Sequence, residues 1–161
     1  MARKKKTEHN YAPRIANRRA NHDYHIGDKL ECGIVLRGSE VKSVRLGKVS
    51  LGEGYAAVDE KTMQLELHNV DIARYPHAGE HQHAPKRPRV LLAHKREVAK
   101  LIGQSSAKGT TLVPLAMYFV RGRVKVEIGV GTGKKQFDKR QDLKKQQSDR
   151  DIRRAMTRKV L

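Results

Sequence analysis

The 161-residue sequence contains one cysteine, two phenylalanines and no tryptophan, and only 17 acidic residues accompany its 35 lysines and arginines. Cys32 cannot form an internal disulfide and leaves no cysteine pair for zinc, so we expect it in the core of a protein from a reducing compartment. No run approaches the roughly 18 apolar residues of a membrane-spanning helix. Residues 1–6 also lack the apolar stretch of a secretory signal. We therefore expect a cytoplasmic protein without a membrane partner.

The patterns of common catalytic sites are missing as well. There is no glycine loop followed by Lys-Ser or Lys-Thr, no Gly-x-Ser-x-Gly elbow, and no cysteine with recognisable histidine and asparagine partners. Gly129-x-Gly131-x-Gly133 follows the last expected strand without a crossover unit. This favours a flexible segment at the end of the barrel over a nucleotide-binding site. We expect no enzymatic activity and no cofactor.

Three histidines in one segment, His77, His81 and His83, have a spacing that could hold a metal. Carboxylates are sparse around them and basic residues are common, so we expect no metal site. A solvated loop is one alternative, and hydrogen bonding or stacking on unpaired RNA bases is the one we favour.

The formal charge of +18 indicates a polyanionic partner, and most of the excess lies at the two ends of the chain. Residues 1–22 hold seven basic residues and one acidic residue, and residues 132–161 hold eleven and four. The 109 residues between them hold 17 and 12. Basic ends around a moderately charged body are typical of binding to a phosphate backbone, where each neutralised phosphate releases a counterion.

The hydrophobic pattern predicts a mainly β protein. A period of two indicates strands, and the segments concerned are 29–36, 51–58, 63–70, 110–120 and 124–130, with a further apolar run at 91–92. Helices are expected at 39–47 and at 94–102, where Gly103 would be the stop, and a weaker one at 15–20. Residues 73–88 read as a long irregular loop. These elements predict a small oligonucleotide-binding type of β-barrel with two or three short flanking helices.

The domain boundaries follow from this pattern. We expect a flexible basic arm at 1–12, an RNA-binding barrel at 13–132 and a basic tail at 133–161. The tail's apolar stripe is too narrow to dock firmly, so the tail should fold on binding. Tyr118 and Phe119 are expected in the core. Phe137 has no core to join and is a candidate for stacking on a base.

Several separated motifs then make the sequence resemble one family, the SmpB proteins that bind tmRNA, the RNA that rescues stalled bacterial ribosomes. The motifs are Asn17-Arg18-Arg19-Ala20, His22-Asp23-Tyr24, 31–36 (ECGIVL), 38–45 (GSEVKSVR), His68-Asn69, Lys95-Arg96-Glu97, 122–126 (GRVKV) and 133–140 (GKKQFDKR).

The resemblance implies a barrel that grips the tRNA-like domain of tmRNA and a tail that becomes helical on the ribosome. It implies tmRNA, the decoding centre of the small ribosomal subunit and, through alanyl-tmRNA, elongation factor Tu as partners of a monomer. The candidate RNA contacts are Arg18, Arg19, His22, Tyr24, Glu31, Lys42, Arg45, Arg87, Arg89, Leu92 and His94. The candidate ribosome contacts in the tail are Lys134, Lys135, Phe137, Asp138, Lys139 and Arg140.

The sequence departs from the family pattern at two places. Phe137 stands where the family commonly has another ring, which keeps a stacking surface but loses a histidine donor. The segment 84–93 (APKRPRVLLA) has lost an acid and a lysine of the usual motif but keeps Arg87 and Arg89. A ribosomal protein or a general RNA chaperone is the alternative function, and a nuclease using the loop histidines with Asp71 or Glu80 is a more distant one.

Overall fold

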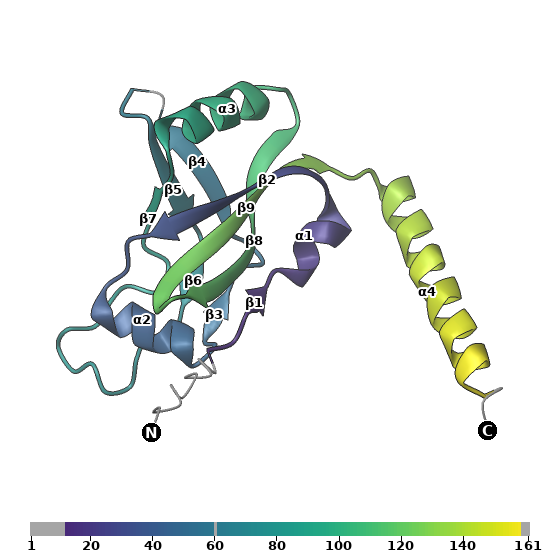
Figure 1. Ribbon diagram of the computed structural model, residues 1–161, viewed down its shortest axis with the longest axis horizontal. Helices are drawn as coiled ribbons and strands as arrows, with labels where there is room; N and C mark the ends of the chain where they lie inside the picture. The colour runs from purple at the N-terminus through teal and green to yellow at the C-terminus, as the bar shows by residue number, and fades with distance from the viewer. Residues whose placement is uncertain (1–11, 60, 159–161) are drawn as a thin grey trace, which may run out of the picture.

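The computed structural model describes residues 12–59 and 61–158, which form a β-barrel with short helices around it and a long helix at its C-terminal side (Figure 1). The strands are β1 (Ile15–Ala16), β2 (Tyr24–Ile34), β3 (Val49–Ser50), β4 (Tyr55–Asp59), β5 (Gln64–His68), β6 (Asp71–Ile72), β7 (Arg89–Leu92), β8 (Thr110–Val120) and β9 (Arg123–Gly133). The helices are α1 (Arg18–Asp23), α2 (Gly38–Arg45), α3 (Lys95–Ser105) and α4 (Gln136–Arg158).

The barrel closes because β8 pairs at both ends of the strand order. Going round the ring, the strands follow as β8, β4, β5, β7, β2 and β9, and β9 pairs again with β8. All these pairings are antiparallel. Closure removes the unpaired strand edges that would otherwise invite association with other chains. The short β1 adds to β8 beyond the place where β4 pairs, and β3 and β6 form a separate small sheet.

The core lies inside this ring and is built by the inward residues of each strand. The register places Leu30 opposite Ile128 and Cys32 opposite Val126, so alternate residues of β2 and β9 point inward. Leu65 and Leu67 of β5 join them as buried residues. The predicted core position of Cys32 is confirmed.

The mainly β barrel predicted from the sequence is confirmed, with shifted element ends. β2 begins at Tyr24 and stops at Ile34, whereas the pattern predicted 29–36. Pro114 does lie at a bulge, since the register of β8 against β9 shifts between Pro114 and Ala116. α2 ends at Arg45, and Gly47 follows with a positive φ of 70°.

Two helix boundaries differ from the prediction. Gly103 was expected to stop α3, but the helix continues through it to Ser105, because a single glycine lowers helix propensity without preventing the backbone hydrogen bonds. The weak helix expected at 15–20 is instead the short strand β1 followed by α1. Asn17 caps α1, and its side-chain oxygen accepts from the N–H groups of Arg19 and Ala20.

The C-terminal tail is the 23-residue helix α4, which extends away from the barrel (Figure 1). The sequence predicts a tail that becomes helical on binding the ribosome, and this dependence on binding stays a prediction. The expected N-terminal arm lies outside the described residues except for residue 12. Within residues 12–59 and 61–158, no helix combines the length and apolar character needed to cross a membrane.

Candidate nucleic-acid interface

One outward face of the barrel gathers charged and aromatic side chains from three neighbouring strands. Glu31 of β2 lies directly opposite Glu127 of β9, and Lys125 of β9 lies opposite Tyr118 of β8. Since inward residues alternate with these four, their side chains share the outer face. We call this set, Glu31, Tyr118, Lys125 and Glu127, the β2–β9 face.

Two carboxylates that oppose each other across a strand pair repel, and each has its own donors on the β2–β9 face. The Tyr118 hydroxyl donates to Glu31 Oε2 at 2.5 Å, and Lys125 Nζ lies 3.7 Å from Glu31 Oε1. Arg14 Nη2 lies 2.7 Å from Glu127 Oε2. Each of the two carboxylates on this face therefore has a nearby donor. Glu31 is nevertheless exposed and can accept further hydrogen bonds.

Leu92 borders the same face. Its side chain is 58% exposed, and it lies over Gly33, where an added Cβ would come within 3.2 Å of the Leu92 Cβ. A groove of about 360 Å³ lies beside it and is lined by apolar side chains and by the two cations Arg123 and Lys125. The structure thus brings Glu31 and Leu92, both predicted as RNA contacts, to one region. His94, another predicted RNA contact, is exposed at the N-cap of α3.

Tyr24 and Arg19 lie together at a second position. Both line a cavity of about 220 Å³ between α1 and the barrel, with Tyr55 also in its wall. Tyr24 packs against Gly131, where a Cβ would meet the Tyr24 Cβ at 3.1 Å, so glycine lets the tyrosine lie close to β9. Arg18 is exposed on α1, and His22 is exposed with Nδ1 2.9 Å from Asp23 Oδ1.

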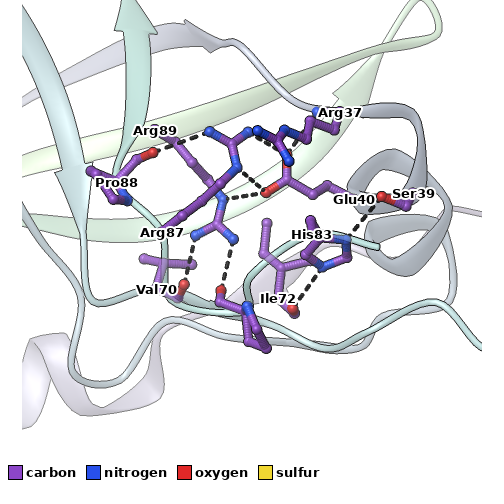
Figure 2. A network of polar contacts seen from close by, with 10 residues as sticks. Arg37, Ser39, Glu40, Val70, Ile72, His83, Arg87, Pro88 and Arg89 are labelled. Carbon is purple, nitrogen blue, oxygen red and sulfur yellow. Dashed lines mark hydrogen bonds and ion pairs between the residues drawn. The ribbon is translucent and has the colours of Figure 1, made fainter. Parts of the chain in front are cut away.

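Arg89 is a correction to the predicted RNA contacts. Its side chain is only 1% exposed, and its Nε donates to Glu40 Oε1 at 2.9 Å (Figure 2). The other two guanidinium nitrogens donate to the carbonyl oxygens of Val70 and Pro85, each at 2.7 Å. Arg89 therefore joins α2 to the loop 73–88 from inside the molecule and is not available to RNA. A buried charge needs such pairing to be tolerated.

Arg87 takes part in the same network from its rim. Its Nε and Nη2 both donate to the Glu40 carboxylate, at 2.9 and 2.5 Å, in the bidentate geometry that favours arginine over lysine. Burial would raise the pKa of Glu40, but hydrogen bonds from Arg87, the Arg37 N–H and Arg89 outweigh it and hold that pKa below its ordinary value. Arg87 keeps part of its side chain exposed, so contact with RNA stays a prediction for this residue.

His83 corrects the interpretation of the loop histidines. It is buried, its Nε2 lies 3.0 Å from the carbonyl oxygen of Ile72, and its Nδ1 lies 3.0 Å from Ser39 Oγ (Figure 2). A carbonyl can only accept, so Nε2 carries the proton and donates to Ile72. His83 therefore fixes the loop to α2 and can neither stack on a base nor join a metal site. His77 and His81 remain on the surface of the loop.

Lys42 and Arg45 lie on α2, at the other end of the barrel from α1 and α4 (Figure 1). Lys42 Nζ lies 5.1 Å from the centre of the Tyr75 ring, and the Arg45 guanidinium lies 5.6 Å from that of Phe119. The structure does not bring these two cations together with Tyr24, although the sequence placed all of them in one set of contacts.

The predicted tail residues divide into two groups. Lys134 Nζ donates to the Asn21 carbonyl oxygen at 2.7 Å, and Lys139 Nζ donates to Asp23 Oδ1 at 2.8 Å. The hydrogen bond from Lys139 is the main reason that the pKa of Asp23 lies below its ordinary value. The first turn of α4 is thus attached to α1. Asp138 Oδ2 accepts from the Lys135 N–H at the helix start.

The other tail residues face outward. Phe137 is 68% exposed, and Lys135 and Arg140 are exposed beside it. An exposed ring between cations is suited to stacking on a nucleobase.

The sequence interpretation missed four residues of the β2–β9 face and its border, namely Tyr118, Lys125, Glu127 and Arg14. Tyr118 was expected in the core, but its hydroxyl reaches outward to Glu31, whereas Phe119 does pack against the core. Lys125 was not considered as a contact. Arg14 lies with its guanidinium 4.6 Å from the Tyr118 ring centre, and nothing in its local sequence marks that contact.

The fold and these surfaces define a basic β-barrel protein with a charged helical extension. The family model described as "SmpB protein" matches residues 14–158, so the chain belongs to the SmpB family.

Proteins similar to this chain carry the corresponding name. An SsrA-binding protein of Thermobifida fusca is 47% identical over 161 residues, covering 99% of both chains. Another, from Carboxydothermus hydrogenoformans, is 46% identical over 140 residues, covering 87% of this chain and 93% of its own. A solved structure described as "tmRNA-SmpB: a journey to the center of the bacterial ribosome" matches with a TM-score of 0.66 at 45% identity, covering 78% of this chain and 87% of the other.

Proposed function

We propose that this protein is an RNA-binding adaptor of trans-translation. Its barrel binds the tRNA-like domain of tmRNA and brings the alanyl-charged RNA, with elongation factor Tu, to a stalled ribosome. Its C-terminal helix probes the decoding centre and the vacant mRNA channel. The protein itself makes or breaks no bond in this role.

The observation that carries the proposal is the exposed Glu31 carboxylate on the outer face of a barrel with a net positive charge. An acidic side chain repels phosphate, so it has no place in a surface that reads only charge. It can accept hydrogen bonds from exocyclic amines and 2′-hydroxyl groups, which distinguish a structured RNA from other polyanions. Leu92, exposed beside it, gives an apolar contact for an unstacked base or a sugar.

The arrangement of the tail supports the second half of the proposal. α4 leaves the barrel at α1 and carries exposed cations and the exposed Phe137 away from the β2–β9 face. One molecule can therefore contact two RNA surfaces at the same time. The names of the relatives, SsrA-binding proteins, and the description of the solved tmRNA–SmpB structure support tmRNA and the ribosome as the two partners.

The first test measures affinity for the isolated tRNA-like domain and for an unstructured RNA of equal length. We expect the wild-type protein to prefer the tRNA-like domain, and Glu31→Ala and Tyr24→Ala each to weaken that binding about tenfold or more. Glu66→Ala, which removes a strand carboxylate outside the predicted contacts, is the matched control. Unchanged affinity in both Glu31→Ala and Tyr24→Ala would exclude these surfaces, and efficient competition by bulk tRNA or ribosomal RNA would favour a general RNA chaperone.

The second test separates the tail from the barrel. A chain that ends at Gly133 should keep nearly all its affinity for the tRNA-like domain but fail to support tagging of stalled products in a reconstituted translation system. Normal tagging by this truncated chain would refute the role of the tail.

A further inference from the structure

Tyr118 holds an unusual position for an aromatic strand residue of this barrel. It lies three residues before Arg121 of the turn Arg121-Gly122 and opposite Lys125, so its side chain points out of the barrel. The Arg14 guanidinium lies 4.6 Å from its ring centre, which fixes the plane of the ring from one side. Its hydroxyl donates to Glu31 Oε2 at 2.5 Å. Tyr118 thus connects the third strand of the β2–β9 face to the carboxylate at its centre.

The two oxygens of Glu31 have different surroundings because of this contact. Oε2 is occupied by the Tyr118 hydroxyl, while the polar contact of Oε1 within residues 12–59 and 61–158 is the longer one of 3.7 Å to Lys125 Nζ, beyond hydrogen-bond distance. The Glu31 side chain is about half exposed, so water or a ligand reaches Oε1. Oε1 can therefore accept a hydrogen bond from an outside donor. The hydrogen bond between Tyr118 and Oε2 fixes the direction in which Oε1 points.

We propose that Tyr118 is a positioning residue for RNA recognition: its hydroxyl fixes the rotamer of Glu31 so that Oε1 faces a donor group of the bound RNA. The inference rests on the proposed function, in which Glu31 contacts the tRNA-like domain. Tyr118 itself acts through Glu31 and makes no essential contact with the RNA.

The physical reason lies in the cost of ordering a glutamate side chain. A free surface glutamate samples many rotamers, and binding has to select one of them. A side chain that is already held in the binding geometry avoids this cost, which raises affinity without adding a contact to the ligand. Glu127 adds a second reason, because its charge directly across the strand pair drives an untethered Glu31 carboxylate away.

The phenol is suited to this role at all physiological pH values. The hydrogen bond to Glu31 is the largest of the effects that raise the pKa of Tyr118 to about 12. The hydroxyl therefore remains protonated and remains a donor.

The test is a double-mutant cycle on the full-length protein, with affinity for the tRNA-like domain as the measurement. We expect Tyr118→Phe to weaken binding about threefold to tenfold, as for loss of one hydrogen bond to a charged group at a partly exposed site. In a Glu31→Gln background the same change should have almost no further effect. Tyr75→Phe removes a tyrosine hydroxyl from the loop 73–88 and serves as the matched control.

A second measurement examines the contact without RNA. In the ¹³C NMR titration of the tyrosine ring carbons, Glu31→Gln should lower the pKa of Tyr118 from about 12 towards the ordinary tyrosine value of about 10. A tyrosine whose hydroxyl made no hydrogen bond to Glu31 would not respond in this way.

The outcomes separate the two proposals. A full Tyr118→Phe penalty in the Glu31→Gln background would mean that Tyr118 contacts RNA directly or only supports the fold, and it would overturn the inference. An unchanged affinity of Tyr118→Phe alone would overturn it as well. If the wild-type protein shows no preference for the tRNA-like domain, the proposed function itself fails. A pKa of Tyr118 that still falls in Glu31→Gln would then show that the contact with Glu31 exists although the proposed function is wrong.

Discussion

Replacing Glu40 by glutamine tests how the loop 73–88 is held to the barrel. The substitution keeps the size of the side chain but removes its charge and turns an amide donor towards guanidinium groups. Glu40 is 0% exposed, and Arg89, its inner partner, would keep a buried charge without compensation (Figure 2). Removing one partner of such a pair lowers the free energy of unfolding by about 3–5 kcal/mol.

The measurement is chemical and thermal unfolding of the free protein. For a chain of this length a loss of that size lowers Tm by about 6–20 °C. Glu66→Gln, a change of the same kind on the outer face of β5, is the control and should shift the free energy of unfolding by less than about 0.5 kcal/mol. The reasoning is refuted if Glu40→Gln unfolds within about 1 kcal/mol of the wild type, which is below the range for a broken buried pair.

A compensating substitution separates the cost of an unpaired charge from a loss of packing. In Glu40→Leu with Arg89→Met, both buried charges are gone and apolar side chains of comparable volume replace them. Such replacements are often neutral or stabilising compared with a buried ion pair. We therefore expect the double variant to recover at least half of the stability that Glu40→Gln loses. If it is less stable than Glu40→Gln, packing and backbone contacts dominate this site.

The same network gives the stability of the protein a pH dependence. The pKa of Glu40 is below its ordinary value in the native state, so between the two values the unfolded chain binds more protons than the folded one. The contribution of Glu40 is therefore complete above the ordinary glutamate pKa and is lost as the pH falls through the lower native value. We expect the free energy of unfolding to fall more steeply below about pH 4.5 in the wild type than in Glu40→Gln.

Three further predictions follow from single contacts. Gly54→Ala should lower the free energy of unfolding by about 1–3 kcal/mol, because a Cβ there would lie 2.5 Å from Val70 Cγ2, and chemical denaturation measures this loss. Lys139→Ala should speed amide hydrogen exchange in the first turn of α4, because it removes the bond to Asp23, while a single partly exposed ion pair of this kind leaves Tm nearly unchanged. Cys32 should resist an aromatic disulfide reagent at pH 8 until the protein unfolds, because burial raises the pKa of its thiol to about 11; fast reaction of the folded protein would contradict its burial.

The sequence predicted the barrel well because its strands carry a clear two-residue period. β9 is the best example, with Val124, Val126 and Ile128 inward and Lys125 and Glu127 outward. The helix ends were less certain, because tertiary contacts decide whether a glycine such as Gly103 stops a helix. The joining of β8 to both β4 and β9, which closes the ring, depends on contacts between distant segments and left no local signal.

The candidate site was predicted in part. Glu31 and Leu92 came from the family resemblance, and the structure brings them to one region. The outward position of Tyr118 was available in the sequence: a two-residue turn at Arg121-Gly122 pairs residue 118 with the outward Lys125. The bulge after Pro114 obscured this alternation.

Arg89 could not have been placed from sequence, because an arginine beside Arg87 in a basic loop is usually exposed. Only the approach of Glu40 from a segment 49 residues away buries it. The same contact shows why positive charge alone is a poor guide to RNA contacts in this chain.

The two kinds of polar contact in this molecule have different consequences for its proposed action. Glu40 and Arg89 are buried, so their loss affects the whole fold. Lys134, whose side chain is largely buried, and Lys139, which is partly exposed, both hold the start of α4 to α1, so their loss mainly affects the direction of α4. Because the first turn of α4 is fixed to α1 next to Tyr24, the barrel sets the direction in which the tail leaves. RNA bound near Tyr24 and a ribosomal surface reached by α4 would then be held in a defined relation, which a flexible linker at this position would not provide.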